Sequence, residues 1–250
     1  MRSRAAQAPP RRCSPAVPRW FTQPAATTQR GVYPADMRDT YHDELDAIST
    51  SLVEMANLVG SAMSRATTAL LDADLKLAES VIANDEAVDA LYRDTEARAF
   101  DLLARQQPVA SDLRVLVTSL RMVADLERMG DNAAHVAKIA RRRYPSSAVP
   151  PALRATVLKM GHVAQEIVAK AGSVIAGRDI TLAAELEKDD DVMDELHWQL
   201  CTAILDDRWD QGVEAAIDIT LVGRHYERFA DHAVSVARRV VYLVTGQRHD

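Results

Sequence analysis

Two stretches of this sequence repeat each other 100 residues apart, and they decide the fold. They read LERMGDNAAHVA over residues 126–137 and YERFADHAVSVA over residues 226–237. A Glu-Arg pair, an Asp, an Ala and a Val-Ala pair occupy the same places in both. Apolar residues recur in each stretch at three- and four-residue steps, which is the pattern of an amphipathic helix. The pattern predicts an internal duplication built from helices.

The duplication extends toward the N-terminus. A shift of 105 residues aligns 55–91 with 160–196 without a gap, and a loop shorter by five residues then changes the shift to 100. Each copy is long enough for three helices, and each leaves an apolar edge uncovered. We therefore predict an all-α protein of two tandem three-helix bundles, whose packing closes one six-helix body.

Apolar periodicity, capping residues and breakers give the expected bounds of six helices. Asp72 and Asp74, and later Asp179, have N-cap chemistry, and Gly177 is the expected stop before Asp179. We expect the first repeat over 37–144 and the second over 151–244, joined by a Pro- and Ser-rich linker. The helices are predicted at about 41–71, 72–105, 108–143, 151–176, 180–206 and 209–243.

Charge is distributed unevenly along the chain. Residues 1–36 carry a net charge of +5 and the remainder −11, which together give −6. An acidic body of this kind is a poor nucleic-acid binder. The Arg- and Pro-rich residues 1–36 lack helical periodicity and are expected to be disordered, and Met37 is a candidate translation start.

The sequence also indicates a compartment. No segment contains the roughly 18–20 consecutive apolar residues that span a bilayer. Cys13 and Cys201 are too isolated to form a disulfide framework. We therefore expect a soluble, cytoplasmic protein.

Each repeat has two pairs of acidic residues at i, i+4 spacing that recur at equivalent positions in the other repeat, which makes four recurrent pairs in all. Other acidic pairs, such as Asp206 with Asp210, have no counterpart and are interpreted as solvated surface. The recurrent pairs continue or border the apolar stripes of their helices, where like charges cost helix stability and burial costs more. The candidate site residues are Asp85, Asp89, Glu127 and Asp131 in the first repeat, and Asp190, Asp194, Glu227 and Asp231 in the second.

Two kinds of positive charge could offset these carboxylates. Clustered carboxylate oxygens from neighbouring helices suit hard cations such as magnesium, manganese or ferric iron. Arginine is the alternative: Arg128 and Arg228 lie beside the acids, and Arg114, Arg121 and Arg128 follow at seven-residue steps. His232 is interpreted with Arg128 and Arg228 as a second layer around the site, rather than as a ligand.

Catalysis has no visible support in the sequence. The paired Glu-x-x-His motif of di-iron oxidases, a phosphate loop, an HExxH helix and a G-x-S-x-G elbow are all absent. Three functions stay open on the residues alone. They are a regulatory adaptor with a metal site, a carboxylate-bridged metalloenzyme, and a metal-free interaction bundle whose arginines neutralise the acids.

The same residues resemble the PhoU family of phosphate-uptake regulators. The resemblance covers about 37–243 and departs at Asn132, where the second copy has His232. It implies two three-helix bundles with multinuclear metal bound through E(D)xxxD motifs, which here are the four recurrent pairs. The resemblance rests on four segments: SDLR at 111–114, LRMVADLERMGDN at 120–132, YERFADHA at 226–233 and MRDTYHDEL at 37–45.

The resemblance also implies a role and partners. Proteins of this family are expected to couple the ATPase subunit of a phosphate ABC importer to a membrane sensor histidine kinase. They restrain uptake and repress the phosphate-starvation response when phosphate is plentiful. A homodimer in the cytoplasm, peripheral to the membrane only through its partners, is expected, with no enzymatic activity.

Overall fold

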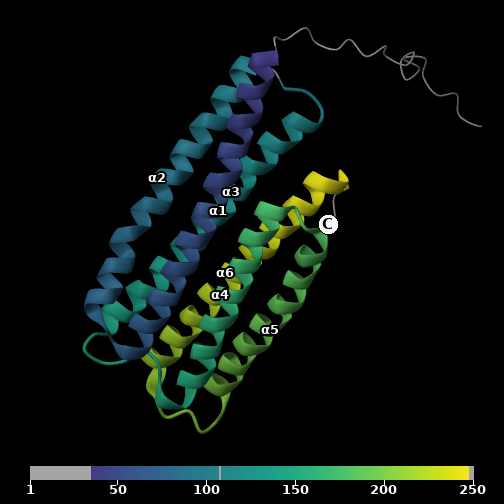
Figure 1. The fold of residues 1–250 in the computed structure, drawn as a ribbon. Coiled ribbons are helices and arrows are strands. Elements are labelled where there is room, and N and C mark those ends of the chain that lie inside the picture. Colours follow the sequence, from purple (N-terminus) through teal and green to yellow (C-terminus); the bar gives the residue numbers. More distant parts are fainter. Residues whose placement is uncertain (1–34, 107, 248–250) are drawn as a thin grey trace, which may run out of the picture. The chain divides into compact units, whose positions relative to one another are not determined.

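Helices α1 to α6 make up the fold of the chain, whose computed structural model describes residues 35–106 and 108–247 (Figure 1). The chain divides into two units, Met1–Arg38 and Asp39–Asp250, and the helix packing described below belongs to the second. The predicted fold class, an all-α body of two three-helix repeats, is confirmed. The helices are α1 (Ala35–Asp72), α2 (Leu75–Gln106), α3 (Ser111–Arg143), α4 (Arg154–Gly177), α5 (Ile180–Leu205) and α6 (Gly212–Thr245), with a 3-10 turn, η2 (Pro151–Leu153), before α4. The expected disorder of the N-terminal extension falls on residues 1–34, which lie outside the described part.

Most predicted helix ends lie within a few residues of the observed ones. Asp74 accepts a hydrogen bond from the backbone N–H of Leu77 at 3.0 Å. Asp179 caps α5 by accepting from Thr181 at 2.8 Å and from Leu182 at 3.1 Å. Both predicted caps are therefore present, since each carboxylate satisfies an N–H that the first helical turn leaves free.

Four predicted bounds were wrong. Asp72 belongs to the last turn of α1, and Gly177 is the last residue of α4 rather than its stop. The left-handed position falls on Arg178, with φ 51°, whose N–H bonds to the carbonyl of Val174. The third and sixth helices begin three residues later than expected, at Ser111 and Gly212, because the preceding residues form turns.

Helices α1 and α4 pack closely against each other in an antiparallel sense. A Cβ added at Gly161 would lie 2.6 Å from Cγ2 of Thr67, and one at Gly172 would lie 3.5 Å from Cβ of Ala56. The shift of 105 converts one of these contacts into the other. The two repeats therefore meet around an internal pseudo-twofold axis.

Helices α3 and α6 repeat this relation. Nδ1 of His232 lies 3.2 Å from Oδ1 of Asp125, and Nδ1 of His225 lies 3.0 Å from Oδ1 of Asn132. The shift of 100 exchanges these two contacts, and the two helices run antiparallel. Four helices, α1 and α3 from one repeat and α4 and α6 from the other, thus form the contact between the repeats.

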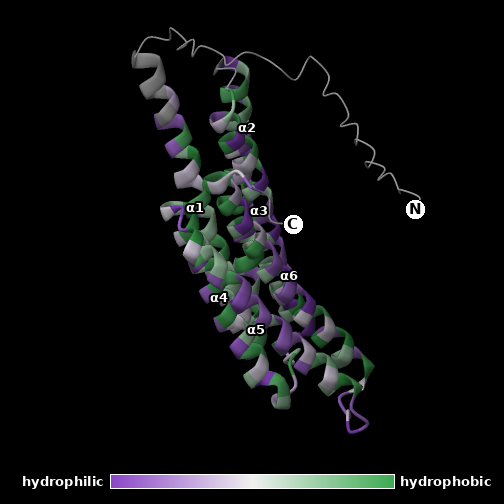
Figure 2. Cartoon of the chain, turned by 90° about the vertical axis from the view of Figure 1, so that its right-hand side faces the viewer, coloured by the Kyte–Doolittle hydropathy of each residue, from purple (hydrophilic) through white to green (hydrophobic). Residues whose placement is uncertain are grey.

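Apolar side chains fill the space between these helices. Tyr226 and Phe229 of α6 are fully buried among methionines and leucines from both repeats. The hydroxyls of Tyr226 and Thr67 share a hydrogen bond of 2.6 Å, which satisfies both polar groups inside the core. Apolar and polar residues mix along the helices (Figure 2), and in the described part no helix is long and apolar enough to cross a membrane.

The close approach at Gly161 gives a test of the packing. Gly161→Ala should lower the free energy of unfolding by about 1–3 kcal/mol, because the new methyl group meets the branched side chain of Thr67. Gly177→Ala is the matched control on the same helix, since no heavy atom lies within 4 Å of its added Cβ. Urea unfolding of both variants measures the difference; equal stabilities would contradict the described packing of α1 on α4.

Candidate functional site

Four acidic residues of the second repeat gather between α5 and α6. Asp190 lies half-buried where the stripe of Leu182 and Leu186 continues along α5. Burial, and after it the carboxylates of Asp194 and Asp231, raise the pKa of Asp190 to about 6. Its buried Oδ1 has no hydrogen-bond partner within the described residues. An orphaned carboxylate oxygen of this kind is costly unless a cation or a proton satisfies it.

The matching residues of the first repeat gather between α2 and α3. Burial and then the carboxylates of Asp131 and Asp89 raise the pKa of Asp85. Burial and then Asp131 also raise the pKa of Glu127, against the lowering influence of Arg128. The structure therefore brings the eight predicted residues together as two groups of four.

Gly130 of α3 leaves room for the carboxylate group of the first repeat. A Cβ added at Gly130 would lie 3.2 Å from Oδ1 of Asp85 and 3.2 Å from Cγ1 of Val88. The second repeat has Ala230 at this position. The two groups thus share their residue types and their helices but differ in the space that surrounds them.

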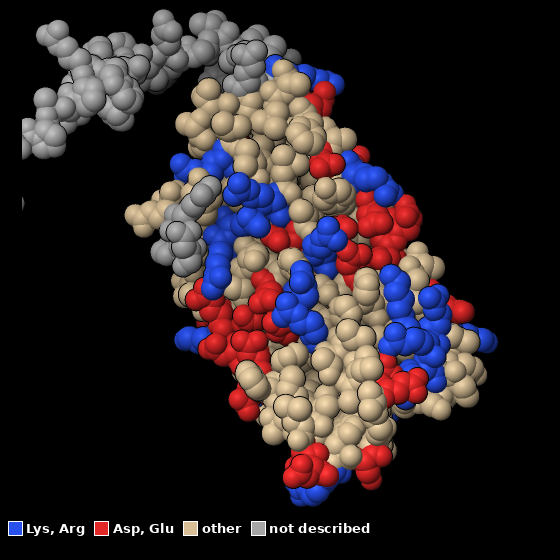
Figure 3. Space-filling model, turned by 180° about the vertical axis from the view of Figure 1, so that it is seen from behind, with Lys and Arg blue, Asp and Glu red and all other residues tan. Residues whose placement is uncertain are grey.

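Arginine pairs with one helix of each group. Arg128 lies 3.5 Å from Glu127 and 3.0 Å from Asp131. In the second repeat Arg224, one turn earlier than expected, pairs with Glu227, whereas Arg228 forms no ion pair with a described residue. Figure 3 shows Lys and Arg side chains lying close to acidic ones over one face. Arg128 is 61% exposed, so solvent screens its pairs and they are weak.

The donor set of each group suits a hard cation. Four carboxylates supply only oxygen ligands, which magnesium, manganese and ferric iron prefer. Among the described residues, however, no three His, Cys, Asp or Glu side chains converge closely enough to hold a metal ion. A cation would therefore have to draw the carboxylates together and displace Arg128 or Arg224.

Other polar contacts of this region were not anticipated from the sequence. Asp125, 9% exposed, accepts a hydrogen bond from Arg239 at 2.6 Å and contacts His232. His232 therefore takes part in the contact between α3 and α6. We had expected it to lie in a second layer around the carboxylate group. The ring centroids of His135 and His225 lie 4.9 Å apart, with the ring planes tilted by 38°. Burial, and after it His135, lower the pKa of His225 to about 4.

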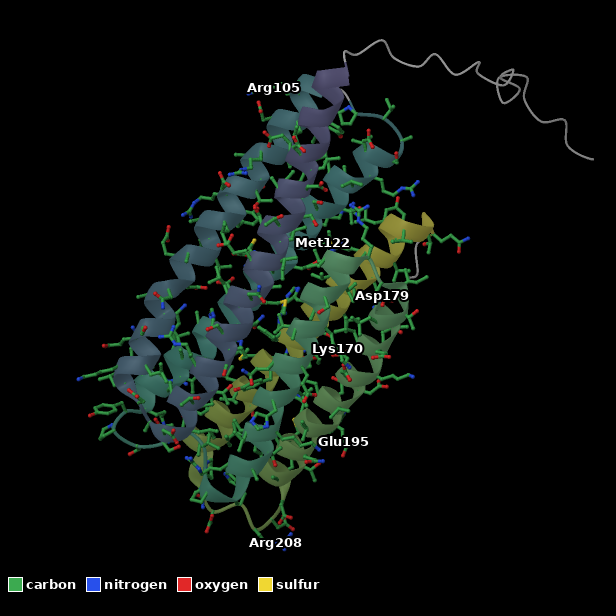
Figure 4. The ribbon with its side chains drawn as sticks, in the orientation of Figure 1. Arg105, Met122, Lys170, Asp179, Glu195 and Arg208 are labelled. Carbon is green, nitrogen blue, oxygen red and sulfur yellow. The ribbon has the colours of Figure 1, made fainter. Side chains whose placement is uncertain are left out.

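Ion pairs around the buried Asp218 join the N-terminal end of α6 to the C-terminal end of α3. Asp218, only 2% exposed, pairs with Arg142 and, at 3.0 Å, with Arg143. Arg143 also contacts Glu214 at 2.5 Å. The run of three arginines at 141–143 was the only signal for these pairs in the sequence. Lys170, labelled in Figure 4, lies on α4, and its Nζ is 2.7 Å from Oδ2 of Asp189 on α5.

Comparisons with known proteins agree with one another. The PhoU domain model matches residues 52–140 and again 157–240. The phosphate-specific transport system accessory protein PhoU homolog 2 of Mycobacterium tuberculosis is 51% identical over 210 residues, which cover 84% of this chain and 99% of that protein. A PhoU homolog of Aquifex aeolicus is 35% identical and covers 82% of this chain and 92% of its own length.

Solved structures give the same result. The crystal structure of PhoU from Pseudomonas aeruginosa superposes with a TM-score of 0.75 at 31% identity, covering 83% of this chain and 100% of that one. The phosphate transport system regulatory protein PhoU from Streptococcus pneumoniae gives a TM-score of 0.76 at 27% identity, over 84% of this chain and 99% of that one.

The raised pKa of Asp190 predicts a pH-dependent stability. Folding favours the protonated carboxyl, so this side chain costs no stability below pH 3.8, and the cost grows until the pH passes about 6. Since Asp190 is half exposed, we expect Asp190→Asn to stabilise the chelator-treated protein by only about 1 kcal/mol at pH 7.5. The gain should vanish near pH 3.5, as measured by urea unfolding at both pH values. Glu195→Gln, at an exposed position on the same helix, is the control; a gain independent of pH would contradict the assignment.

Proposed function

Because this chain belongs to the PhoU family, we propose that it regulates phosphate uptake. The support is the family model that matches both repeats, together with relatives whose names describe accessory proteins of the phosphate-specific transport system. The match spans 99% of the length of the M. tuberculosis accessory protein. The action proposed is non-enzymatic.

The mode of action that we propose is that of a cytoplasmic adaptor. It contacts the ATPase subunit of the phosphate ABC importer on one side and a sensor histidine kinase on the other. When phosphate is plentiful, it restrains uptake and represses the starvation response. A homodimer would present each contact surface twice.

Exposed helix faces support an adaptor. On α6 the apolar side chains of Val213, Ile217 and Leu221 follow at four-residue steps and are 77%, 54% and 38% exposed. On α3 Leu113 and Val117 occupy the matching places, with exposures of 41% and 38%. Rows of this spacing are what a helix or groove of a partner protein covers.

Metal binding by the two carboxylate groups is part of the proposal. The orphaned oxygen of Asp190, the mutual repulsion of the acids and their recurrence in both repeats support it. A bound cation would supply the positive charge that these groups lack, and would stabilise the closed packing of α2 on α3 and of α5 on α6. The ions considered are iron, manganese and magnesium.

A metal-free interaction bundle is the second candidate. The contacts of Arg128 with Glu127 and Asp131, and of Arg224 with Glu227, favour it. In that case arginine alone offsets the acids. Both candidates keep the regulatory role and differ only in what neutralises the carboxylates.

Metal binding can be tested with matched pairs of variants. Manganese at 1,000 times its dissociation constant should raise the free energy of unfolding by about 4 kcal/mol for each occupied site. The double variant Asp85→Asn with Asp131→Asn should remove the stabilisation by manganese that comes from the first repeat. The double variant Asp190→Asn with Asp231→Asn should remove the stabilisation that comes from the second. Equilibrium dialysis counts the ions, and thermal unfolding with and without chelator reports the stabilisation.

The control uses an exposed pair of the same spacing on α5. Asp191→Asn with Glu195→Gln should leave the ion count and the stabilisation unchanged, because both side chains face solvent. Wild-type protein that binds no manganese, iron or magnesium would refute the metal sites and support the metal-free bundle.

The regulatory role is tested in the cell. Deletion of the gene, in a strain without a second copy, should derepress phosphate-starvation genes in high phosphate, because the restraint on the kinase is lost. Transcript levels and labelled phosphate uptake measure the effect, and a plasmid copy should restore repression. Normal repression in the deletion strain would contradict the role.

A further inference from the structure

A cavity of about 310 Å³ lies between the N-terminal end of α3 and the C-terminal end of α6. Arg114, Arg121 and Thr118 line it on α3, and Tyr242 lines it on α6. Leu113 and Val117 complete an apolar wall. The cavity is separate from both carboxylate groups, which involve other residues.

The two arginines and the threonine of this cavity form no ion pair and no side-chain hydrogen bond with other described residues. Within the described residues, neither Arg114 nor Arg121 forms an ion pair, although acidic residues outnumber basic ones in the chain by 36 to 30. Thr118 is only 3% exposed, and its hydroxyl makes no hydrogen bond inside the described part of the chain. The hydroxyl of Thr118 is therefore available to donate a hydrogen bond to an acceptor in the cavity.

Neighbouring residues hold Arg114 in place. Its Cζ lies 5.5 Å from the centre of the Tyr242 ring. A Cβ added at Gly246 would lie 2.8 Å from its Nη1, and Gly246 has a φ of 72° that suits glycine. The guanidinium therefore fits between the ring and the end of α6. Asp112, the nearest acid along α3, acts instead on Tyr41, whose pKa burial raises first and Asp112 second.

The equivalent position at the other end of the α3–α6 contact contains carboxylates paired with arginines. Under the shift of 100, Thr118 corresponds to Asp218 and Arg114 to Glu214. Tyr242 corresponds to Arg142. In the second repeat the two carboxylates of α6 are neutralised by Arg142 and Arg143 of α3. In the first repeat the cationic side chains are present and the carboxylates are not.

We propose that the cavity binds a small organic dianion, either a phosphate monoester or a dicarboxylate. The two guanidinium groups supply forked donors for its oxygens, and the hydroxyl of Thr118 supplies one more. The Tyr242 ring and the wall of Leu113 and Val117 cover its organic part. The volume is at the lower end of the range for small-molecule sites.

Calorimetric titration of the full chain tests the site with three probes at constant ionic strength: AMP, glutarate and inorganic phosphate. We expect AMP or glutarate to bind at about millimolar concentration or below. Binding of AMP alone identifies a phosphate monoester, and binding of glutarate alone identifies a dicarboxylate. Inorganic phosphate should bind more weakly than the better organic probe, because it leaves the apolar wall uncovered.

Variants separate the site from general charge effects. Arg114→Gln and Arg121→Gln should each weaken binding about tenfold, and Thr118→Val about fivefold. Arg141→Gln, an exposed arginine on the same helix, should leave binding unchanged. Because Arg121 is exposed, Arg121→Gln should keep the wild-type melting temperature even if Arg114→Gln lowers it.

Two results would overturn the proposal. One is that none of the three probes binds at 10 mM, about ten times the expected dissociation constant. The other is that Arg141→Gln weakens binding as much as Arg121→Gln does. Neither result bears on the regulatory role or on the metal sites, whose tests use other residues and other readouts.

Discussion

The antiparallel contact of α3 with α6 is the constraint that positions every other feature. Each helix buries one face against its counterpart in the other repeat, and polar pairs such as Asp125 with Arg239 cross the contact at 2.6 Å. The opposite faces of the same two helices carry Glu127 and Glu227 toward α2 and α5. Because these faces belong to rigid helices, the placement of the carboxylates follows from the packing of the core.

This arrangement sets a conflict between packing and charge. Asp85 and Asp190 continue stripes that would otherwise be apolar, and burial disfavours their ionised forms. Exposed arginines can offset only part of that cost, because water screens them. The two carboxylate groups therefore combine half-buried acids with only partial neutralisation by arginine in both repeats.

The sequence was sufficient for the features that depend on local patterns. The six helices follow from apolar periodicity, and the cap at Asp179 follows from its residue type. The grouping of the acids into two sets of four followed from the duplication, since helices related by the repeat must present equivalent faces.

Features set by side-chain direction or by distant partners were not predictable in this way. Arg224 rather than Arg228 pairs with Glu227 because it lies one turn earlier on the same face. The partners of Asp125 and Asp218 come from residues more than 70 positions away. The left-handed backbone conformation after α4 falls on Arg178, although residues other than glycine rarely adopt it. Gly177 was therefore the expected position of the helix stop, and this prediction was wrong.

The unlike ends of the α3–α6 contact have a consequence for assembly. Two homologous repeats could in principle pair like with like, within a chain or between chains. Two first repeats would bring Arg142 and Arg143 against Arg114, and two second repeats would bury Asp218 beside Tyr242 without a cation. Only the pairing of a first with a second repeat gives Asp218 its arginines and keeps Arg142 and Arg143 away from Arg114, so the charges at the helix ends favour this pairing over the other two.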